Sequence, residues 1–144
     1  MQPLYLDRDP AVTASLYTKH TVIDLLPKVA YMLCAAHYVL DREQMYYKVP
    51  IPQDTNSEFC VWARATSGNY MWLYGLFMAM LYEYANTNGK KHELKKYTEY
   101  LRKPPVGTVG SSWSSPPDGS PNEVGSNHPD YYRQLESPVE GLLQ

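Results

Sequence analysis

The sequence predicts an all-α protein, a compact helical bundle built around a buried central helix. Residues 69–84 form an almost unbroken apolar and aromatic run in which only Asn69 and Glu83 are strongly polar. This run is shorter than the roughly 20 apolar residues that a bilayer requires, so other helices are expected to pack around it. A chain of 144 residues suits one domain with a substantial core. We therefore expect a single helical domain whose central helix covers about residues 69–86.

The expected core of the domain, residues 9–103, begins with two helices. Asp9 precedes Pro10, and a capping carboxylate followed by a proline is typical of the first turn of a helix. Over residues 20–40, apolar side chains recur at helical spacing on one side. This pattern predicts a long amphipathic helix with a kink at Pro27.

Turn-forming residues separate the helices that follow. Residues 41–58 contain two prolines and show no sustained period, which predicts a connection over the surface. A short helix is expected at 58–65, and Ser67 and Gly68 are expected to break it. The central helix then begins at Asn69.

The chain changes character after the central helix. The sequence Asn-Thr-Asn-Gly at 86–89 is expected to stop that helix, and one thin apolar stripe predicts another helix at 90–102. Residues 104–127 are rich in Gly, Ser and Pro, so they are expected to drape over the helical body or to be mobile. The tail, residues 128–144, is expected to form one or two short helices.

Charge is unevenly distributed along the chain, whose formal net charge is −2. Residues 90–103 hold six basic and two acidic side chains, which leaves the rest of the chain with a charge of −6. This basic cluster is interpreted either as a solvated helix face or as a contact surface for a polyanion. Two cysteines in apolar contexts and the lack of a signal-peptide pattern predict a reduced, cytoplasmic protein without a membrane partner.

The sequence lacks the standard motifs of metal, phosphate-loop and hydrolase chemistry. It contains no Cys-x-x-Cys pair, no Gly-rich phosphate loop and no nucleophile elbow. Its four histidines are scattered without ligand spacing. We therefore expect neither a metal site nor an organic cofactor.

Three residues are candidates for catalysis. A reaction with an amine nucleophile needs an amine and a carboxylate in one cleft, and Asp24 with Lys28 supplies both on one helix. Glu83, near the end of the central helix, supplies a further carboxylate. The alternative for Asp24 and Lys28 is a solvated i,i+4 ion pair, and the alternative for Glu83 is a structural ion pair with a cation such as Arg64.

Aromatic and basic residues are candidates for binding a nucleotide or a phosphate. Trp62 can stack on a base, and the planar fork of Arg64 matches phosphate oxygens. The competing interpretation places Trp62 in the core and makes His37 a semi-buried histidine with satisfied hydrogen bonds. The candidate binding residues are Lys19, His20, His37, Trp62, Arg64, Asn69, Lys91 and His92.

Eight short motifs follow one another along most of the chain. They are Asp7 to Pro10, Lys19-His20, Ala36-His37, Trp62-Ala63-Arg64, Asn69 to Leu73, Glu83-Tyr84, Gly89 to His92 and Pro129 to Tyr132. Their order and spacing resemble a family of small helical bacteriophage proteins. That family is distantly similar to the pyrimidine-dimer DNA glycosylases of the endonuclease V type.

This resemblance implies a compact helical enzyme without a metal or organic cofactor. An amine would attack the anomeric carbon of an N-glycosidic bond, a carboxylate would stabilise the developing positive charge, and basic residues would hold DNA phosphates. In this chain Asp24 precedes Lys28, whereas the phage family carries the two charges in the opposite order, which leaves the inherited catalytic helix in question.

Three functions therefore remain open. The first is a nucleic-acid- or nucleotide-directed enzyme of the glycosylase-like type. The second is a non-catalytic phage accessory protein that binds or sequesters a nucleotide or docks on a host protein in the host cytoplasm. The third is a structural or assembly protein, and an oligomer is compatible with each.

Overall fold

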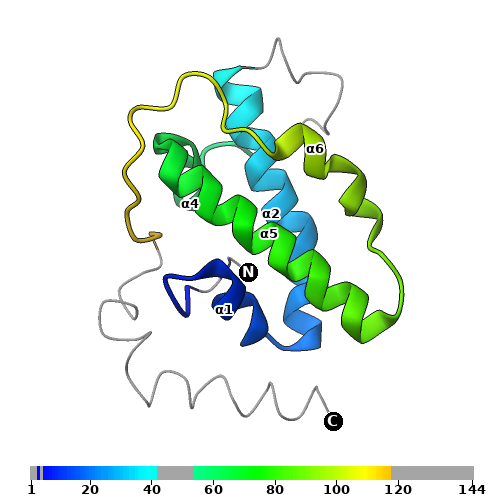
Figure 1. Cartoon of the computed structure of the whole chain (residues 1–144). Coiled ribbons are helices and arrows are strands. Elements are labelled where there is room, and N and C mark those ends of the chain that lie inside the picture. The colour runs from blue at the N-terminus through cyan, green and yellow to red at the C-terminus, as the bar shows by residue number, and fades with distance from the viewer. Residues whose placement is uncertain (1–2, 4, 42–53, 118–144) are drawn as a thin grey trace.

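The computed structural model describes residues 3, 5–41 and 54–117, and within these ranges the chain forms helices that pack against one another and no strands (Figure 1). This arrangement confirms the prediction of a compact all-α bundle. The elements are α1 (Pro10–Ser15), α2 (Lys19–Leu40), α4 (Glu58–Ala65), α5 (Ser67–Asn88), the 3₁₀ helix η1 (Glu93–Tyr97) and α6 (Thr98–Leu101).

The central helix of the sequence prediction is α5. It contacts α1, α2 and α4, and its side chains supply much of the core. The left-handed backbone of Gly89, with φ at 71°, ends the helix, because its N–H bonds to the Ala85 carbonyl. The fully buried core side chains of α5 are Tyr70, Leu73, Leu76, Phe77 and Met80.

The break before α5 differs from the prediction. Ser67 and Gly68 lie inside the first turn of α5, and the only residue between α4 and α5 is Thr66. The extended backbone of Thr66 ends α4, while its hydroxyl accepts a 3.1 Å hydrogen bond from the Asn69 N–H and caps α5. The prediction was wrong because one capping threonine is enough to turn the chain.

The two N-terminal helices begin as the sequence predicts. The Asp9 carboxylate accepts from the Ala11 N–H at 2.9 Å and Pro10 is the first residue of α1. A close approach brings α1 onto α5, because a Cβ atom added to Gly75 would lie 2.9 Å from Pro10 Cγ. Thr18 caps α2, which continues through Pro27 as one helix.

Helix α2 is long and apolar enough to cross a membrane. However, 61% of its most apolar stretch of 18 residues is buried inside the bundle. The core helix of a folded protein has the same properties. In this structure α2 packs against α4 and α5.

The segment predicted as one helix at 90–102 instead forms two short pieces, η1 and α6. After α6, residues 102–117 run in an extended path along α4 and the start of α5, and we call this segment the strap (Figure 1). Its hydrogen bonds hold residues 109–112 against the helical body. These bonds run from Val109 N to Ala65 O, from Ser67 N to Gly110 O and from Thr66 Oγ1 to Ser112 O. Part of the expected surface connection, residues 42–53, and residues 118–144 with the expected tail helices, lie outside the described residues.

Candidate functional site

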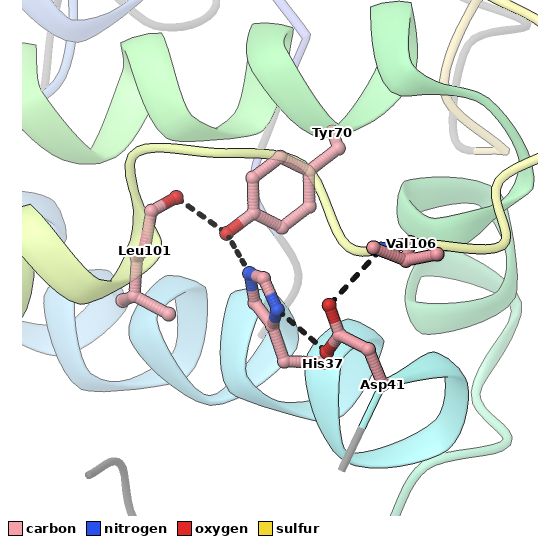
Figure 2. Close-up of polar contacts among 5 residues, drawn as sticks. All are labelled: His37, Asp41, Tyr70, Leu101 and Val106. Carbon is pink, nitrogen blue, oxygen red and sulfur yellow. Dashed lines mark hydrogen bonds and ion pairs between the residues drawn. The ribbon is translucent and has the colours of Figure 1, made fainter. Parts of the chain in front are cut away.

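Three polar side chains form a buried cluster between α2 and α5 (Figure 2). His37 Nδ1 lies 2.8 Å from Asp41 Oδ1, and His37 Nε2 lies 2.9 Å from the Tyr70 hydroxyl oxygen. The hydroxyl donates to the Leu101 carbonyl at 2.5 Å, and Asp41 Oδ2 accepts from the Val106 N–H at 3.0 Å. His37 and Tyr70 are 2% and 0% exposed, so the ring contacts of the cluster are buried, while the Asp41 bond to Val106 lies at its outer edge. His37 therefore makes the satisfied contacts that were the alternative to ligand binding.

A second buried contact fixes the strap through Asn69. The Asn69 amide donates to the Trp62 carbonyl at 3.0 Å and its oxygen accepts from the Ser114 N–H at 2.8 Å. The Trp62 indole N–H donates to the Ser114 carbonyl at 3.1 Å. Both Trp62 and Asn69 are buried, at 7% and 1% exposure. Their polar atoms are thus used within the fold.

The structure also gives Arg64 an internal partner. Its guanidinium donates to the Thr55 carbonyl, which connects the last turn of α4 to the segment that precedes this helix. Among the described residues Arg64 forms no ion pair with Glu83, and Glu83 has no ion pair at all there. The structural pairing weighed for these two side chains is therefore not formed in the described part of the chain.

Asp24 and Lys28 form an exposed ion pair on α2. Lys28 Nζ lies 3.3 Å from Asp24 Oδ2, with the two side chains 41% and 49% exposed. Such i,i+4 pairs stabilise a helix by only a few tenths of a kcal/mol. Lys28 also borders a hollow of about 380 Å³ between α2 and α4. The remaining residues that line this hollow are Tyr31, Met32, Asp54, Ser57 and Cys60.

The last four candidates separate into two regions. Lys19 and His20 occupy the first turn of α2, far along that helix from His37. Lys91 and His92 instead face the C-terminal half of α5, where they border a groove of about 270 Å³. We call this the basic groove. Its lining residues are Met78, Leu81, Tyr82, Ala85, Lys91, His92 and Lys95.

The basic groove combines an apolar floor with a cationic wall. Tyr82 is 66% exposed and Met78 is 40% exposed, so α5 presents an aromatic ring and a thioether to solvent. Lys91 and Lys95 form no ion pair within the described ranges. An anion with an attached flat ring would therefore meet complementary groups on both sides of the groove.

His92 connects the wall of the groove to the fold. Its Nδ1 accepts from the Leu94 N–H at 3.0 Å and caps η1, while its ring packs edge to face on Tyr84 at 4.7 Å. Burial lowers the pKa of His92, and the charge of Glu93 opposes this effect. Because Nδ1 accepts, the neutral ring carries its proton on Nε2, which stays available as a donor.

Sequence reasoning missed Asp41 and Tyr82, two residues that the structure makes prominent. Asp41 and Tyr70 complete the buried cluster, and Tyr82 and Lys95 complete the basic groove. The helical spacing of Met78 and Tyr82 was an available signal, because both fall on one face of α5 and neither is needed in the core.

No metal site is evident in the part of the chain that the structure describes, since no group of three His, Cys, Asp or Glu side chains is suitably placed there. The three motif segments Ala36-His37, Trp62-Ala63-Arg64 and Asn69 to Leu73 lie around the buried cluster and the strap, whereas Gly89 to His92 borders the basic groove. Comparison with protein-family models, with curated proteins and with solved structures finds no match to this chain.

Proposed function

We propose that this protein binds a phosphate-bearing nucleotide or a nucleic-acid strand in the basic groove. The observation that carries the proposal is the placement of Lys91 and Lys95 beside an apolar floor that contains the exposed ring of Tyr82. Lysines without a carboxylate partner attract phosphate, and an exposed aromatic ring offers a stacking surface to any base.

The dimensions of the groove favour one nucleotide unit. Its volume of about 270 Å³ lies just below the range of about 300–1,000 Å³ that is usual for small-molecule pockets. One base or one sugar-phosphate fits this space, and a longer strand would continue over the neighbouring basic surface. That surface carries further lysines of the 90–103 cluster, including Lys90 and Lys96, which are exposed.

Hydrogen bonding supports the same ligand class. The Nε2–H of neutral His92 can donate to a phosphate oxygen without a change of protonation. Protonation of His92 would place a second proton on Nδ1 and break the bond to the Leu94 N–H. We therefore expect ligand affinity that does not increase as the pH falls below neutrality.

Direct titration tests this proposal. Fluorescently labelled oligothymidylate and a single nucleotide would be titrated into the protein across a salt series. We expect Tyr82→Ala to weaken binding by about 1–3 kcal/mol, which is roughly 5- to 150-fold. Replacing Lys91 and Lys95 by Gln should lower affinity and reduce the salt slope by about one per lysine removed.

A matched control distinguishes binding in the groove from attraction by the positive charge of the whole 90–103 cluster. Lys96→Gln removes the same charge from the same turn, but Lys96 lies over the ring of Tyr97 at 5.2 Å and does not line the groove. We expect Lys96→Gln to change affinity far less than Lys95→Gln. Equal effects of the two lysine variants, together with full binding by Tyr82→Ala, would refute the groove as the site.

The hollow between α2 and α4 favours a second candidate, a glycosylase-like reaction at an N-glycosidic bond. Lys28 and Asp54 line this one hollow and Asp24 lies 3.3 Å from the Lys28 amine. The arrangement supplies the amine and the carboxylates that the family resemblance implies. These groups are solvent-exposed, and an exposed ammonium group is a poor nucleophile at neutral pH.

Lesion-containing DNA tests the second candidate. Base release and strand cleavage would be measured with the unmodified chain, Lys28→Gln and Lys95→Gln. Borohydride reduction would trap any bond between an amine and the sugar. Product that disappears only in Lys28→Gln would favour the reaction, whereas folded protein that yields no product on any lesion would exclude it.

A further inference from the structure

The buried cluster of His37, Asp41 and Tyr70 determines where its protons lie. The Tyr70 hydroxyl has a single proton, and the Leu101 carbonyl can only accept, so the 2.5 Å contact uses that proton. The oxygen of Tyr70 must therefore accept from His37 Nε2, which lies 2.9 Å away. His37 thus carries a proton on Nε2, the ring nitrogen that faces the Tyr70 hydroxyl in Figure 2.

The same reasoning extends to Asp41. Its Oδ2 accepts from the Val106 N–H, so Oδ1 is the oxygen that faces His37 Nδ1 at 2.8 Å. A neutral ring with its proton on Nε2 would present a lone pair to a carboxylate lone pair. The two side chains are only 3% and 6% exposed, so water does not relieve this repulsion. A second proton must lie between Nδ1 and Oδ1.

We propose that the His37–Asp41 pair holds this additional proton as a latch, which fastens Leu101 and Val106 to α2 and α5. The proton belongs to the pair, as imidazolium with carboxylate or as imidazole with carboxylic acid. If the pair loses it, the remaining ring proton moves to Nδ1 to meet Asp41. Nε2 then becomes an acceptor, and the Tyr70 hydroxyl can donate its single proton either to Nε2 or to the Leu101 carbonyl. One of the four hydrogen bonds of the cluster is lost in either case.

The other titratable groups near the cluster are a thiol, two tyrosines and one surface ion pair. Burial raises the pKa of the Cys34 thiol on α2 to about 12. Burial also raises the pKa of Tyr70 and of Tyr74 on α5, so these three groups stay protonated at neutral pH. On α6, Glu99 and Arg102 lie 3.9 Å apart at the surface and act on Tyr74 with opposite signs. The additional proton is therefore assigned to the His37–Asp41 pair.

The latch has a structural consequence for α6. Tyr70 holds Leu101 and Tyr74 holds the Thr98 carbonyl at 2.9 Å, so two hydroxyls of α5 fasten the short helix. Loss of the proton removes either the contact of Tyr70 with Leu101 or its contact with His37, whereas Asp41 Oδ2 still accepts from the Val106 N–H. The expected sign follows from this geometry: the latched state binds the additional proton, so the latch weakens when that proton is lost at higher pH.

Nuclear magnetic resonance tests the latch directly. In ¹⁵N-histidine-labelled protein at neutral pH, we expect His37 Nε2 to carry a proton, with Nδ1 either protonated or accepting from Asp41. As the pH is raised and the additional proton is lost, the ring ¹⁵N shifts of His37 should show the remaining proton moving from Nε2 to Nδ1. A ring with its proton on Nδ1 and none on Nε2 at neutral pH would overturn the proposal.

Two tyrosine variants give a matched comparison. Tyr70→Phe removes the acceptor for Nε2, so His37 should change to the neutral Nδ1–H form and the pH-dependent move of the ring proton should disappear. Tyr74→Phe removes a hydroxyl bond to the same helix but leaves His37 unchanged. If Tyr70→Phe does not fold, Asp41→Asn replaces it, because an amide cannot take up the additional proton. A pH-dependent move of the ring proton from Nε2 to Nδ1 that persists in Asp41→Asn would refute the latch.

Discussion

The substitution Gly68→Ala tests how closely the strap approaches α5. A Cβ atom at position 68 would lie 2.5 Å from the Ser111 carbonyl oxygen and 2.9 Å from the Trp113 nitrogen. Both atoms belong to the backbone, so no side-chain rotation can relieve the contact. The strap must move away from α5 to make room.

The magnitude follows from the hydrogen bonds that cross this contact. Besides the long Ser67 hydroxyl contact, three bonds of 3.1 Å or less connect the 65–67 turn to strap residues 109–112, and each contributes about 0.5–1.5 kcal/mol net. Alanine is a better helix former than glycine by up to about 1 kcal/mol, which offsets part of the loss. We expect Gly68→Ala to lower the free energy of unfolding by about 1–3 kcal/mol.

Urea denaturation followed by circular dichroism measures this change. Limited proteolysis should show faster cleavage within residues 106–117. Ser67→Ala is the control in the same turn, because its hydroxyl reaches Gly110 only at 3.4 Å and its loss should cost less than about 0.5 kcal/mol. If Gly68→Ala is as stable and as resistant to protease as Ser67→Ala, the close packing of the strap is refuted.

Three further predictions concern buried polar groups. Asn69→Asp should destabilise the fold by about 1–3 kcal/mol, measured by urea denaturation, because a carboxylate oxygen would face the Trp62 carbonyl in place of a donor. The thiols of Cys34 and Cys60 should resist Ellman's reagent at neutral pH, because burial raises the pKa of both, and Cys60 should react first since it lines the α2–α4 hollow. His92 should titrate below 6.5 in a proton NMR experiment. Its contribution to stability is then complete above that pH and is lost as the pH falls through the lowered pKa.

Local signals allowed much of the fold to be predicted. The Asp9-Pro10 cap, the limits of the 58–65 helix and the stop at Gly89 depend on residues within one turn of the boundary. The apolar run at 69–84 identified α5 because a helix that is apolar on nearly all sides must be buried. Helices could thus be predicted wherever a capping residue, a stop signal or an apolar run lay within the helix or next to its end.

The errors and omissions come from contacts between distant residues. Gly68 was interpreted as a helix breaker, but it lies inside α5, where the strap leaves no room for a Cβ atom. The partners His37 and Tyr70 are 33 positions apart, so neither pattern nor spacing indicated their hydrogen bond. The basic groove forms because residues 91–95 return along α5. The sequence indicates that α5 stops at Gly89, but it does not indicate the direction that the chain takes afterwards.

The positions of the motif residues limit what the family resemblance can say about chemistry. His37, Trp62 and Asn69 belong to three of the motifs, and each uses its polar atoms to join helices or to hold the strap. Residues with such roles are expected in any protein that builds the same helical body, whatever it binds. The motif at 89–92 differs, because Lys91 is exposed beside the basic groove and has no ion-pair partner within the described ranges. These motif residues therefore bear on how the helical body is built, and binding at Lys91 and Tyr82 is the property that would connect this chain to nucleic acid.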